Sequence, residues 1–300
     1  MKHTFYKKTV RDVPLDNKTV LVRVDFNVPL EEDGSIADDF RMRESLPTLK
    51  LLLERKCKII LIAHLGRPKE REEKYSFKKI ADHLGDLLNH PVNFLDTATG
   101  DHVRITLKRA PKGSITLLEN LRFYPEEKAN DADFAKKLAK DTGAQYFIQD
   151  AFGNAHRSDA SMSAITQCVP SVAGLLLEKE YMAITSAMLH PERPLIAVLG
   201  GAKVSDKLPL LEALIPKSDM ILIGGAMANT FLAERGLELG KSKVEPDQSA
   251  IVKQIYAKAV KKVGAEKIDD FLVLPRDVAI GKDTSAHSRR RNVALDGVKA

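Results

Sequence analysis

Arginine recurs just beyond short apolar runs of this sequence. Arg67, Arg122 and Arg157 each stand a few residues past the end of such a run. A guanidinium group offers a planar fork of hydrogen-bond donors that matches phosphate or carboxylate oxygens. A single arginine of this kind is more often a solvated surface charge. Three at equivalent places favour one cleft that holds a small, highly anionic phosphorylated ligand.

Further polar residues follow the same runs. Asp25 and Asn27 could bond the hydroxyl groups of a ligand, although such residues at a turn more often cap the local backbone. His64 and Gly66 stand beside Arg67 in the segment HLGRP. The glycine lets the backbone approach a ligand closely, whereas the histidine could contact the ligand or be a buried structural residue. We favour ligand contact for this segment.

The second half of the chain has two glycine pairs after apolar runs. One pair ends at Gly201 and is followed by Lys203 and Lys207, and the other is Gly224 with Gly225. The spacing is not that of a Walker A loop. A glycine pair at a helix N-terminus still presents free N–H groups and a positive dipole to phosphate. Tight packing of backbone is the alternative explanation for each pair alone.

Alternating strand and helix patterns could position these residues. Strand-length apolar runs cover residues 19–26, 58–63, 114–118, 145–148, 194–199 and 220–223. Helical patterns cover 43–54, 76–88 with Ser76 as its cap, and 133–140 with Gly143 as its stop. This order predicts mostly parallel sheets covered by helices on both faces. Such sheets bind ligands beyond the carboxyl ends of their strands, where the polar residues fall.

The length of 300 residues exceeds the roughly 100 to 200 of a typical domain and favours two domains. A helical pattern at 175–189, followed by Pro191 and Pro194, separates two sets of strands. The predicted plan is therefore a domain at 1–174, a connecting helix at 175–190 and a domain at 191–300. The tail at 281–300, with three arginines at 289–291, shows no clear periodicity, and we expect it to be exposed surface.

Composition narrows the class of partner. Lys and Arg number 47 against 41 Asp and Glu, a net charge of +6 that favours anionic partners. Trp is absent and aromatic residues make up 6%, so stacking rings for nucleic acid are scarce, and the basic residues are interleaved with acidic ones. We expect no nucleic acid and no membrane partner. A nucleic-acid binder driven by net charge alone stays as a minor alternative.

The start of the sequence has no apolar stretch that suits a signal peptide, and no run approaches the ~18 residues that span a bilayer. We therefore expect a cytoplasmic protein. Cys57 lies in an apolar run and Cys168 stands just before Val169 and Pro170, with no CxxC spacing. Both are expected to be buried thiols and not a disulfide, a metal site or a nucleophile.

The motifs, taken in order, closely resemble the phosphoglycerate kinase family. The matching segments are RVDFNVP, HLGRP, LLENLRF, DAFGNAHR, LGGAKVSDK and IGGAMANTF. The resemblance implies an α/β fold of two Rossmann-like lobes with parallel sheets flanked by helices. It implies reversible phosphoryl transfer in glycolysis between 1,3-bisphosphoglycerate with ADP and 3-phosphoglycerate with ATP. The first lobe would hold 3-phosphoglycerate and the second the nucleotide with Mg²⁺, in a protein that we expect to be a monomer.

The resemblance also assigns residues to the 3-phosphoglycerate site. Asp25 and Asn27 would position the glycerate, and Arg41 and His64 would face it, with Arg43 the less suitable arginine of the segment FRMR. The full set is Asp25, Phe26, Asn27, Arg41, His64, Leu65, Gly66, Arg67, Arg122 and Arg157.

On the nucleotide side the resemblance assigns Lys203 and Lys207 to the phosphates, with Lys207 nearest the transferred group. Gly201, Gly224 and Gly225 would form the nucleotide pocket, and Arg41 and Lys207 would be the catalytic residues. Ala226 stands where the family often has a third glycine.

The family pattern continues past residue 300 with a GGGD-type loop and an aspartate that helps to hold the Mg²⁺-nucleotide. The sequence lacks those motifs, so the expected second lobe is incomplete. A catalytically impaired fragment that retains 3-phosphoglycerate binding is the alternative function. A dinucleotide oxidoreductase is disfavoured because no GxGxxG follows the first strand.

Overall fold

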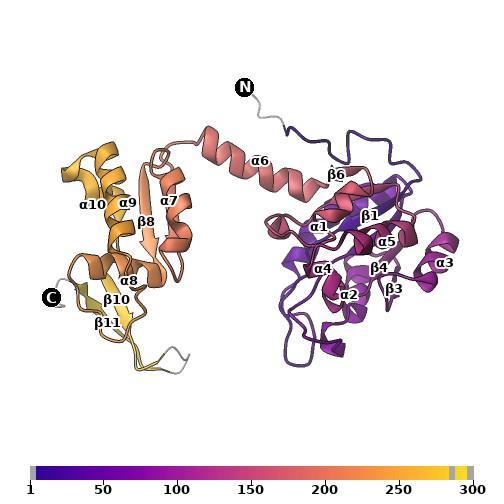
Figure 1. The fold of residues 1–300 in the computed structure, drawn as a ribbon, viewed down its shortest axis with the longest axis horizontal. Helices are drawn as coiled ribbons and strands as arrows, with labels where there is room; N and C mark the ends of the chain where they lie inside the picture. The colour runs from indigo at the N-terminus through magenta and orange to yellow at the C-terminus, as the bar shows by residue number, and fades with distance from the viewer. Residues whose placement is uncertain (1–4, 284–287, 296–300) are drawn as a thin grey trace. The chain divides into compact units, whose positions relative to one another are not determined.

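The computed structural model describes residues 5–283 and 288–295. The chain divides into two compact units, Met1–Ile184 and Thr185–Ala300. Each unit has its own parallel sheet and its own hydrophobic core (Figure 1). None of the described helices is long and apolar enough to cross a membrane.

Unit 1 is built on a six-stranded sheet in the order β3-β4-β2-β1-β5-β6, and every neighbouring pair is parallel. Its strands are β1 (Thr19–Arg23), β2 (Lys58–Ile62), β3 (Val92–Leu95), β4 (Ile115–Leu118), β5 (Tyr146–Gln149) and β6 (Ser171–Ala173). The parallel sheet is confirmed. The sequence patterns did not predict β3 and β6, which are short strands at the two edges, where half-exposed residues leave a weak apolar signal.

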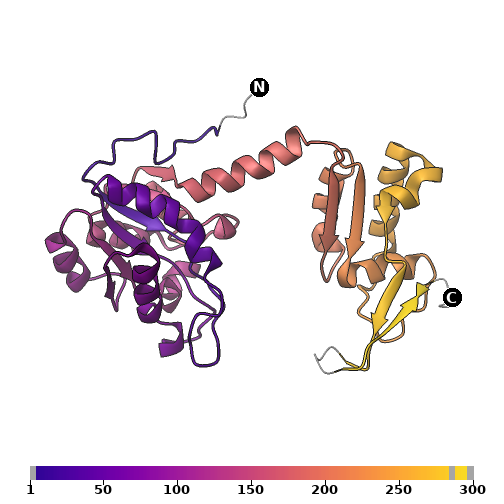
Figure 2. The same cartoon turned by 180° about the vertical axis from the view of Figure 1, so that it is seen from behind.

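Helices cover both faces of this sheet (Figures 1 and 2). On one face, Val20 and Val22 of β1 share a core with α1 (Phe40–Glu54) and α2 (Lys78–Leu88). On the other, Leu21 packs in a second core with α3 (Asp101–Arg109) and α5 (Ala132–Thr142). Alternate residues of a strand point to opposite faces, so an apolar run such as β1 is buried on both sides. The remaining short elements of this unit are η1 (Glu73–Tyr75), η2 (Leu121–Phe123), α4 (Pro125–Lys128), η3 (Phe152–Asn154) and η4 (Ala164–Gln167).

The predicted ends of elements were partly wrong. The first strand ends at Arg23 and not at residue 26, because after the bond from Val24 N to Ile62 O the chain leaves the ladder. α1 begins at Phe40, three residues earlier than predicted, and α2 begins at Lys78. The N-cap position of α2 is Phe77 and not Ser76, but the Ser76 hydroxyl accepts a hydrogen bond from Lys78 N at 3.4 Å while it donates to Glu119 at 2.9 Å. Gly143 does end α5, in the left-handed conformation at φ 62° that glycine adopts readily.

α6 (Leu175–Leu189) is unbroken, as its sequence pattern predicted, and it contains the boundary between the two units. Its first turn is held in unit 1 by two buried side chains. Leu175 N donates to Thr48 Oγ1 at 2.9 Å, and Leu176 N donates to Asp150 Oδ1 at 2.9 Å. These bonds satisfy N–H groups that a helix start leaves without intrahelical partners.

Unit 2 has a three-stranded parallel sheet in the order β7-β8-β9 and a separate antiparallel pair of β10 and β11. The strands are β7 (Ile196–Gly200), β8 (Met220–Gly224), β9 (Leu272–Val273), β10 (Asp277–Ile280) and β11 (Arg291–Ala294). The helical elements are η5 (Ser205–Lys207), α7 (Leu208–Leu214), α8 (Gly225–Glu234), α9 (Ser249–Val263), η6 (Ala265–Lys267) and α10 (Ile268–Phe271). Phe231, Ile255 and Phe271 are among the residues of its core.

The tail differs from its prediction. Arg291–Ala294 forms β11 because its backbone pairs with β10. Most of its side chains stay exposed, which explains why the sequence there has no clear periodicity. Arg289, Arg290 and Arg291 are exposed, as expected. Residues 284–287 and 296–300 of the predicted tail lie outside the described residues.

Both cysteines are free. Cys57 is buried, its sulfur lies 3.1 Å from Leu15 O, and burial raises the pKa of its thiol to about 11. It is therefore the inert buried thiol that was predicted. Cys168 is only half-buried.

Candidate active site

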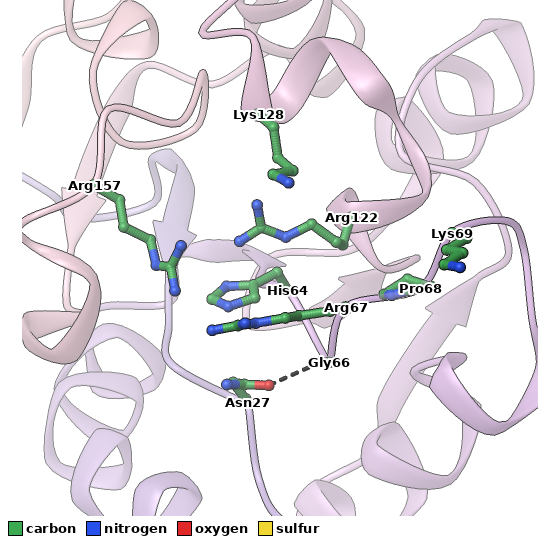
Figure 3. A pocket seen from close by; sticks show the side chains of 9 residues that line it. All are labelled: Asn27, His64, Gly66, Arg67, Pro68, Lys69, Arg122, Lys128 and Arg157. Atoms are coloured by element: carbon green, nitrogen blue, oxygen red, sulfur yellow. Dashed lines mark hydrogen bonds between the residues drawn. The ribbon is translucent and has the colours of Figure 1, made fainter. Parts of the chain in front are cut away.

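A cavity of about 640 Å³ opens beyond the carboxyl ends of the strands of unit 1 (Figure 3). Its size falls in the usual range for small-ligand pockets, roughly 300 to 1,000 Å³. The lining residues are Asn27, His64, Gly66, Arg67, Pro68, Lys69, Arg122, Lys128 and Arg157. Five of them are cationic and none is acidic, so the cavity suits a ligand with several negative charges.

The structure brings the three arginines together (Figure 3). Arg67 follows β2, Arg122 lies in η2 after β4, and Arg157 follows η3 after β5. The parallel order of the sheet explains the meeting, because strands that run the same way deliver their following loops to one edge. The loops come from distant parts of the sequence, and the sheet alone makes them neighbours.

Two of these arginines have donors with no partner in the part of the chain that the structure describes. The Arg122 side chain is only 5% exposed, and its Nη2 lies 3.2 Å from Asp159 Oδ2. The Nε atoms of Arg122 and Arg157 are buried and have no hydrogen-bond partner among the described residues. A buried donor without a partner is costly, and a charged one is more so. An anionic ligand in the cavity could offer acceptors to such guanidinium groups.

Asn120 sets the position of Arg122. Its side chain accepts a hydrogen bond from Arg122 N at 3.0 Å and another from Leu65 N at 3.0 Å, while its Nδ2 donates to Leu65 O at 2.9 Å. The loops after β2 and β4 are thus tied together by one buried amide.

His64 lies between the arginines as a neutral ring (Figure 3). It is 2% exposed, and its Nδ1 lies 2.9 Å from Nη2 of the buried Arg23. Burial lowers the pKa of His64 to about 2, with further lowering by the charges of Arg23, Arg122, Arg157 and Arg41. A positive charge on the ring is therefore disfavoured throughout the physiological pH range.

Asn27 and Gly66 hold the loop that presents Arg67. Asn27 Oδ1 accepts a hydrogen bond from Gly66 N at 2.8 Å. Gly66 has φ +65°, and a Cβ atom there would lie 2.5 Å from Cε1 of Tyr75. Both the left-handed backbone and the close ring therefore require glycine at this position.

Four of the predicted substrate residues do not line this cavity. Asp25 and Arg41 pair with each other, with Arg41 Nη1 2.7 Å from Asp25 Oδ2. The side chains of Phe26 and Leu65 belong to the hydrophobic core of unit 1, so only the backbone of these two residues is left to contact a ligand. Their apolar side chains are buried under the sheet edge, and the neighbouring polar residues face the cavity instead. Arg43 makes a two-point contact with Asp39, also away from the cavity.

The sequence patterns missed cationic residues near the arginines. Lys69 and Lys128 line the cavity and had no pattern to mark them. Arg23 is fully buried and contacts His64. The sequence did contain a signal for this residue, because an arginine inside an otherwise apolar strand needs a buried partner.

The glycine pairs of unit 2 also meet. Gly200 and Gly224 are register partners in β7 and β8. Gly225 has φ +67°, and a Cβ atom there would lie 3.0 Å from Gly201 N, so the two backbones approach too closely for a side chain. A Cβ atom at Gly201 would lie 3.6 Å from Cε of Lys207, which places the lysine side chain beside the glycines.

The two pairs lead into different secondary structure. Gly224 and Gly225 begin α8, as expected for a glycine pair at a helix N-terminus. After Gly201 the chain makes a bend and only the short turn η5, so the expectation of a full helix directly after this pair is wrong. Lys203 is exposed on this bend.

Glu245 anchors the same segment from a distant loop. Its carboxylate accepts hydrogen bonds from Val204 N at 2.7 Å and Ser205 N at 3.1 Å, and a third from the Ser205 hydroxyl. The lysine-bearing turn is therefore held in place although it has no long helix of its own.

Parallel sheets flanked by helices, with a cationic cavity beyond the strand ends of unit 1, define an α/β protein of the phosphate-handling class. The chain belongs to the phosphoglycerate kinase family, whose model, "Phosphoglycerate kinase", matches residues 10–300. It is 44% identical over 295 residues to a phosphoglycerate kinase of Desulforudis audaxviator, covering 98% of this chain and 73% of the relative. It is 45% identical to the one from Chloroflexus aggregans, covering 97% and 72%.

Solved structures agree with this assignment. The phosphoglycerate kinase of Coxiella burnetii superposes with a TM-score of 0.78 at 34% identity, over 98% of this chain and 72% of the other. The phosphoglycerate kinase of Pyrococcus horikoshii OT3 gives a TM-score of 0.78 at 31% identity, over 97% and 71%. The family that the sequence motifs indicated is therefore confirmed, and its members are kinases that transfer phosphoryl groups.

Proposed function

We propose that this chain catalyses reversible phosphoryl transfer between 1,3-bisphosphoglycerate with ADP and 3-phosphoglycerate with ATP, a step of glycolysis. Family membership supports a kinase. The observation that favours this particular substrate is the cavity of unit 1, where Arg67, Arg122 and Arg157 converge and two buried guanidinium donors have no partner among the described residues. A phospho-acid carries the negative charge that such a lining neutralises.

In this proposal the cavity binds 3-phosphoglycerate. The three arginines contact the anionic groups, while Asn27 and His64 contact the ligand from the other strand ends. Arg41 completes the site after exchanging its contact with Asp25 for one with the substrate. Asp25 then accepts a hydrogen bond from a hydroxyl group of the glycerate.

The glycine and lysine cluster of unit 2 binds the nucleotide. Lys203 and Lys207 contact the phosphates, and the backbones of Gly201, Gly224 and Gly225 allow their close approach. The described residues contain no cluster of three or more His, Cys, Asp or Glu side chains that could hold a metal ion. Mg²⁺ commonly keeps several waters and binds through substrate phosphates with one or two carboxylates, so this residue set suits an ion carried by the nucleotide. When bound, the ion neutralises phosphate charge.

The chemistry needs no general base. The attacking group of 3-phosphoglycerate is a carboxylate with a pKa of roughly 3.5, which is ionised at neutral pH. The residues of this chain therefore orient two anionic reactants and neutralise the charge of the transferred group, with Arg41 and Lys207 as the catalytic pair. The proposal places the enzyme in the cytoplasm as a monomer.

A coupled assay of this 300-residue chain with 3-phosphoglycerate, Mg²⁺ and ATP tests the proposal. We expect turnover that Lys207→Ala lowers by about 100-fold, because removing one transition-state donor commonly costs ~3 kcal/mol. Lys253→Ala is the matched control, since this exposed lysine pairs with Glu234 on the surface of unit 2. Binding of 3-phosphoglycerate by calorimetry without any turnover would overturn the kinase proposal in favour of a binding-only fragment.

A further inference from the structure

Arg23 is a buried cation whose hydrogen bonds all stay inside unit 1. Its side chain is 0% exposed at the end of β1. Nη1 donates to Val24 O at 3.1 Å, Nη2 lies 2.9 Å from His64 Nδ1, and Nε has no partner among the described residues. Arg23 does not line the cavity, so it makes no direct hydrogen bond to a ligand there.

The contact with His64 has a defined direction. A guanidinium group has five N–H donors and no acceptor, so His64 Nδ1 must accept the bond. A neutral imidazole has one donor and one acceptor nitrogen, and its proton must then be on Nε2. Nε2 makes no hydrogen bond to another residue in the described part of the chain, and the ring lines the cavity.

We propose that Arg23 is a positioning residue that fixes His64 in its Nε2–H form and so makes the ring a neutral hydrogen-bond donor to the anionic substrate. This inference rests on the proposed function. A histidine free to choose its tautomer would present an acceptor to the ligand part of the time. An acceptor facing a phosphate or carboxylate oxygen is repulsive, whereas an N–H group is attractive.

Burial, together with the charges around the ring, keeps this donor neutral. Arg23 from β1, Arg41 from α1, Arg122 from η2 and Arg157 beyond η3 all disfavour protonation of His64. A doubly protonated ring would lose the contact with Arg23, because both of its nitrogens would then be donors. The site therefore keeps the same hydrogen-bond pattern across neutral pH.

A buried carboxylate offsets the charge of Arg23. Among neighbouring carboxylates, Glu127 has the largest influence on this guanidinium, ahead of Asp25 and Asp159. Glu127 is itself buried and accepts hydrogen bonds from Ser161 N at 2.9 Å and from the Ser161 hydroxyl at 2.5 Å. Burial lowers the pKa of Arg23, and the negative charge of Glu127 opposes that lowering.

Ring nitrogen spectra of the full chain test the tautomer directly. In proton–nitrogen correlation spectra, with the His64 signals assigned by their loss in His64→Gln, we expect a single neutral Nε2–H pattern from about pH 5 to about pH 8. In Arg23→Met we expect a mixture of tautomers and about a tenfold higher KM for 3-phosphoglycerate, with a smaller change in kcat. Arg23→Lys keeps a donor and a charge and should restore part of the Nε2–H population.

The control is Arg55→Met, which also removes an arginine bonded to a backbone carbonyl, that of Val13, but away from His64. It should leave the His64 spectrum unchanged. An Nδ1–H tautomer in the unsubstituted chain would overturn the inference, and this result does not depend on the folding of any Arg23 variant. The spectrum of the free protein does not depend on turnover, so an Nε2–H pattern without activity would count against the proposed function alone.

Discussion

Arg41 Nη1 lies 2.7 Å from Asp25 Oδ2, so two residues assigned to different groups of the substrate hold each other. Arg41 is 49% exposed on its side chain, whereas Asp25 is 9% exposed. The arginine can therefore move out of the pair more easily than the aspartate can. The Asp25 carboxylate holds the Arg41 guanidinium through this ion pair.

Arg41→Ala should lower turnover by about 100-fold, since a positioned cation that neutralises transition-state charge is lost. Arg43→Ala is the matched control two residues along the same helix, because its guanidinium contacts Asp39 instead. Steady-state kinetics with both substrates measures the effect. Equal losses in the two variants would contradict the assignment of Arg41.

Gly66→Ala should weaken 3-phosphoglycerate binding. The new Cβ would meet the Tyr75 ring at 2.5 Å and would force alanine into φ +65°. We expect an increase of at least about tenfold in KM and a loss of roughly 1 to 3 kcal/mol in the free energy of unfolding. Gly113→Ala is the control, because that glycine has φ +78° but no atom within 4 Å of its Cβ position. If both variants raise KM equally, the loop geometry at Gly66 is not what positions the site.

Asp150→Asn should change how stability depends on pH. Burial raises the pKa of Asp150 to about 7, opposed by hydrogen bonds from Thr48 and from the backbone at the start of α6. In the unfolded chain the carboxyl ionises near its ordinary pKa of 3.8. Between these two values the folded state binds more protons than the unfolded state, so this carboxyl lowers stability as pH rises through the window.

Urea unfolding of the wild type and of Asp150→Asn at about pH 5 and about pH 8 measures the effect. The asparagine does not ionise, so the variant should gain stability relative to the wild type at the higher pH. The comparison between chains removes the opposite contribution of His64, whose lowered pKa makes the folded state less stable as pH falls below the usual histidine value. A stability difference that is the same at both pH values would show that Asp150 does not titrate in this window.

Glu245→Gln should weaken nucleotide binding and leave 3-phosphoglycerate binding unchanged. The glutamine keeps the size of the side chain but has one acceptor oxygen in place of two, so its bonds to Val204 N, Ser205 N and the Ser205 hydroxyl cannot all be kept. We expect the KM for ATP to rise several-fold while the KM for 3-phosphoglycerate is unchanged. Glu212→Gln serves as the control, because Glu212 pairs with Lys258 on the surface. A matching rise in both KM values would argue against a role confined to the nucleotide.

The central strands of unit 1 were predicted well from the sequence, for a physical reason. β1, β2, β4 and β5 are apolar along most of their length because both faces of the sheet are covered. β3 and β6 at the edges, and the pair β10 and β11, are half-exposed or exposed, and their residues satisfy no strong apolar pattern. These strands form because they pair with backbone segments that are distant in the sequence, and a short stretch of sequence does not contain those partners.

The candidate site was predictable for a similar reason. The rule that ligands meet the carboxyl ends of parallel strands was enough to group Arg67, Arg122 and Arg157 before their positions were known. Lys128 could not be found this way, because it reaches the cavity from α4 and not from a strand end. The side chains of Phe26 and Leu65 lie in the hydrophobic core while neighbours in their motifs line the cavity, because alternate residues of an extended chain point to opposite sides.

The strand order of unit 1 also limits when the cavity can exist during folding. β1 lies between β2 and β5, so Val20 pairs directly with Tyr146, and β5 pairs in turn with β6 at Ser171. Such non-local pairings form slowly, because long loops must close before the contacts stabilise them. The cavity lining extends from Asn27 to Arg157, so a growing chain has the complete set of anion-binding residues only after residue 157 has been added.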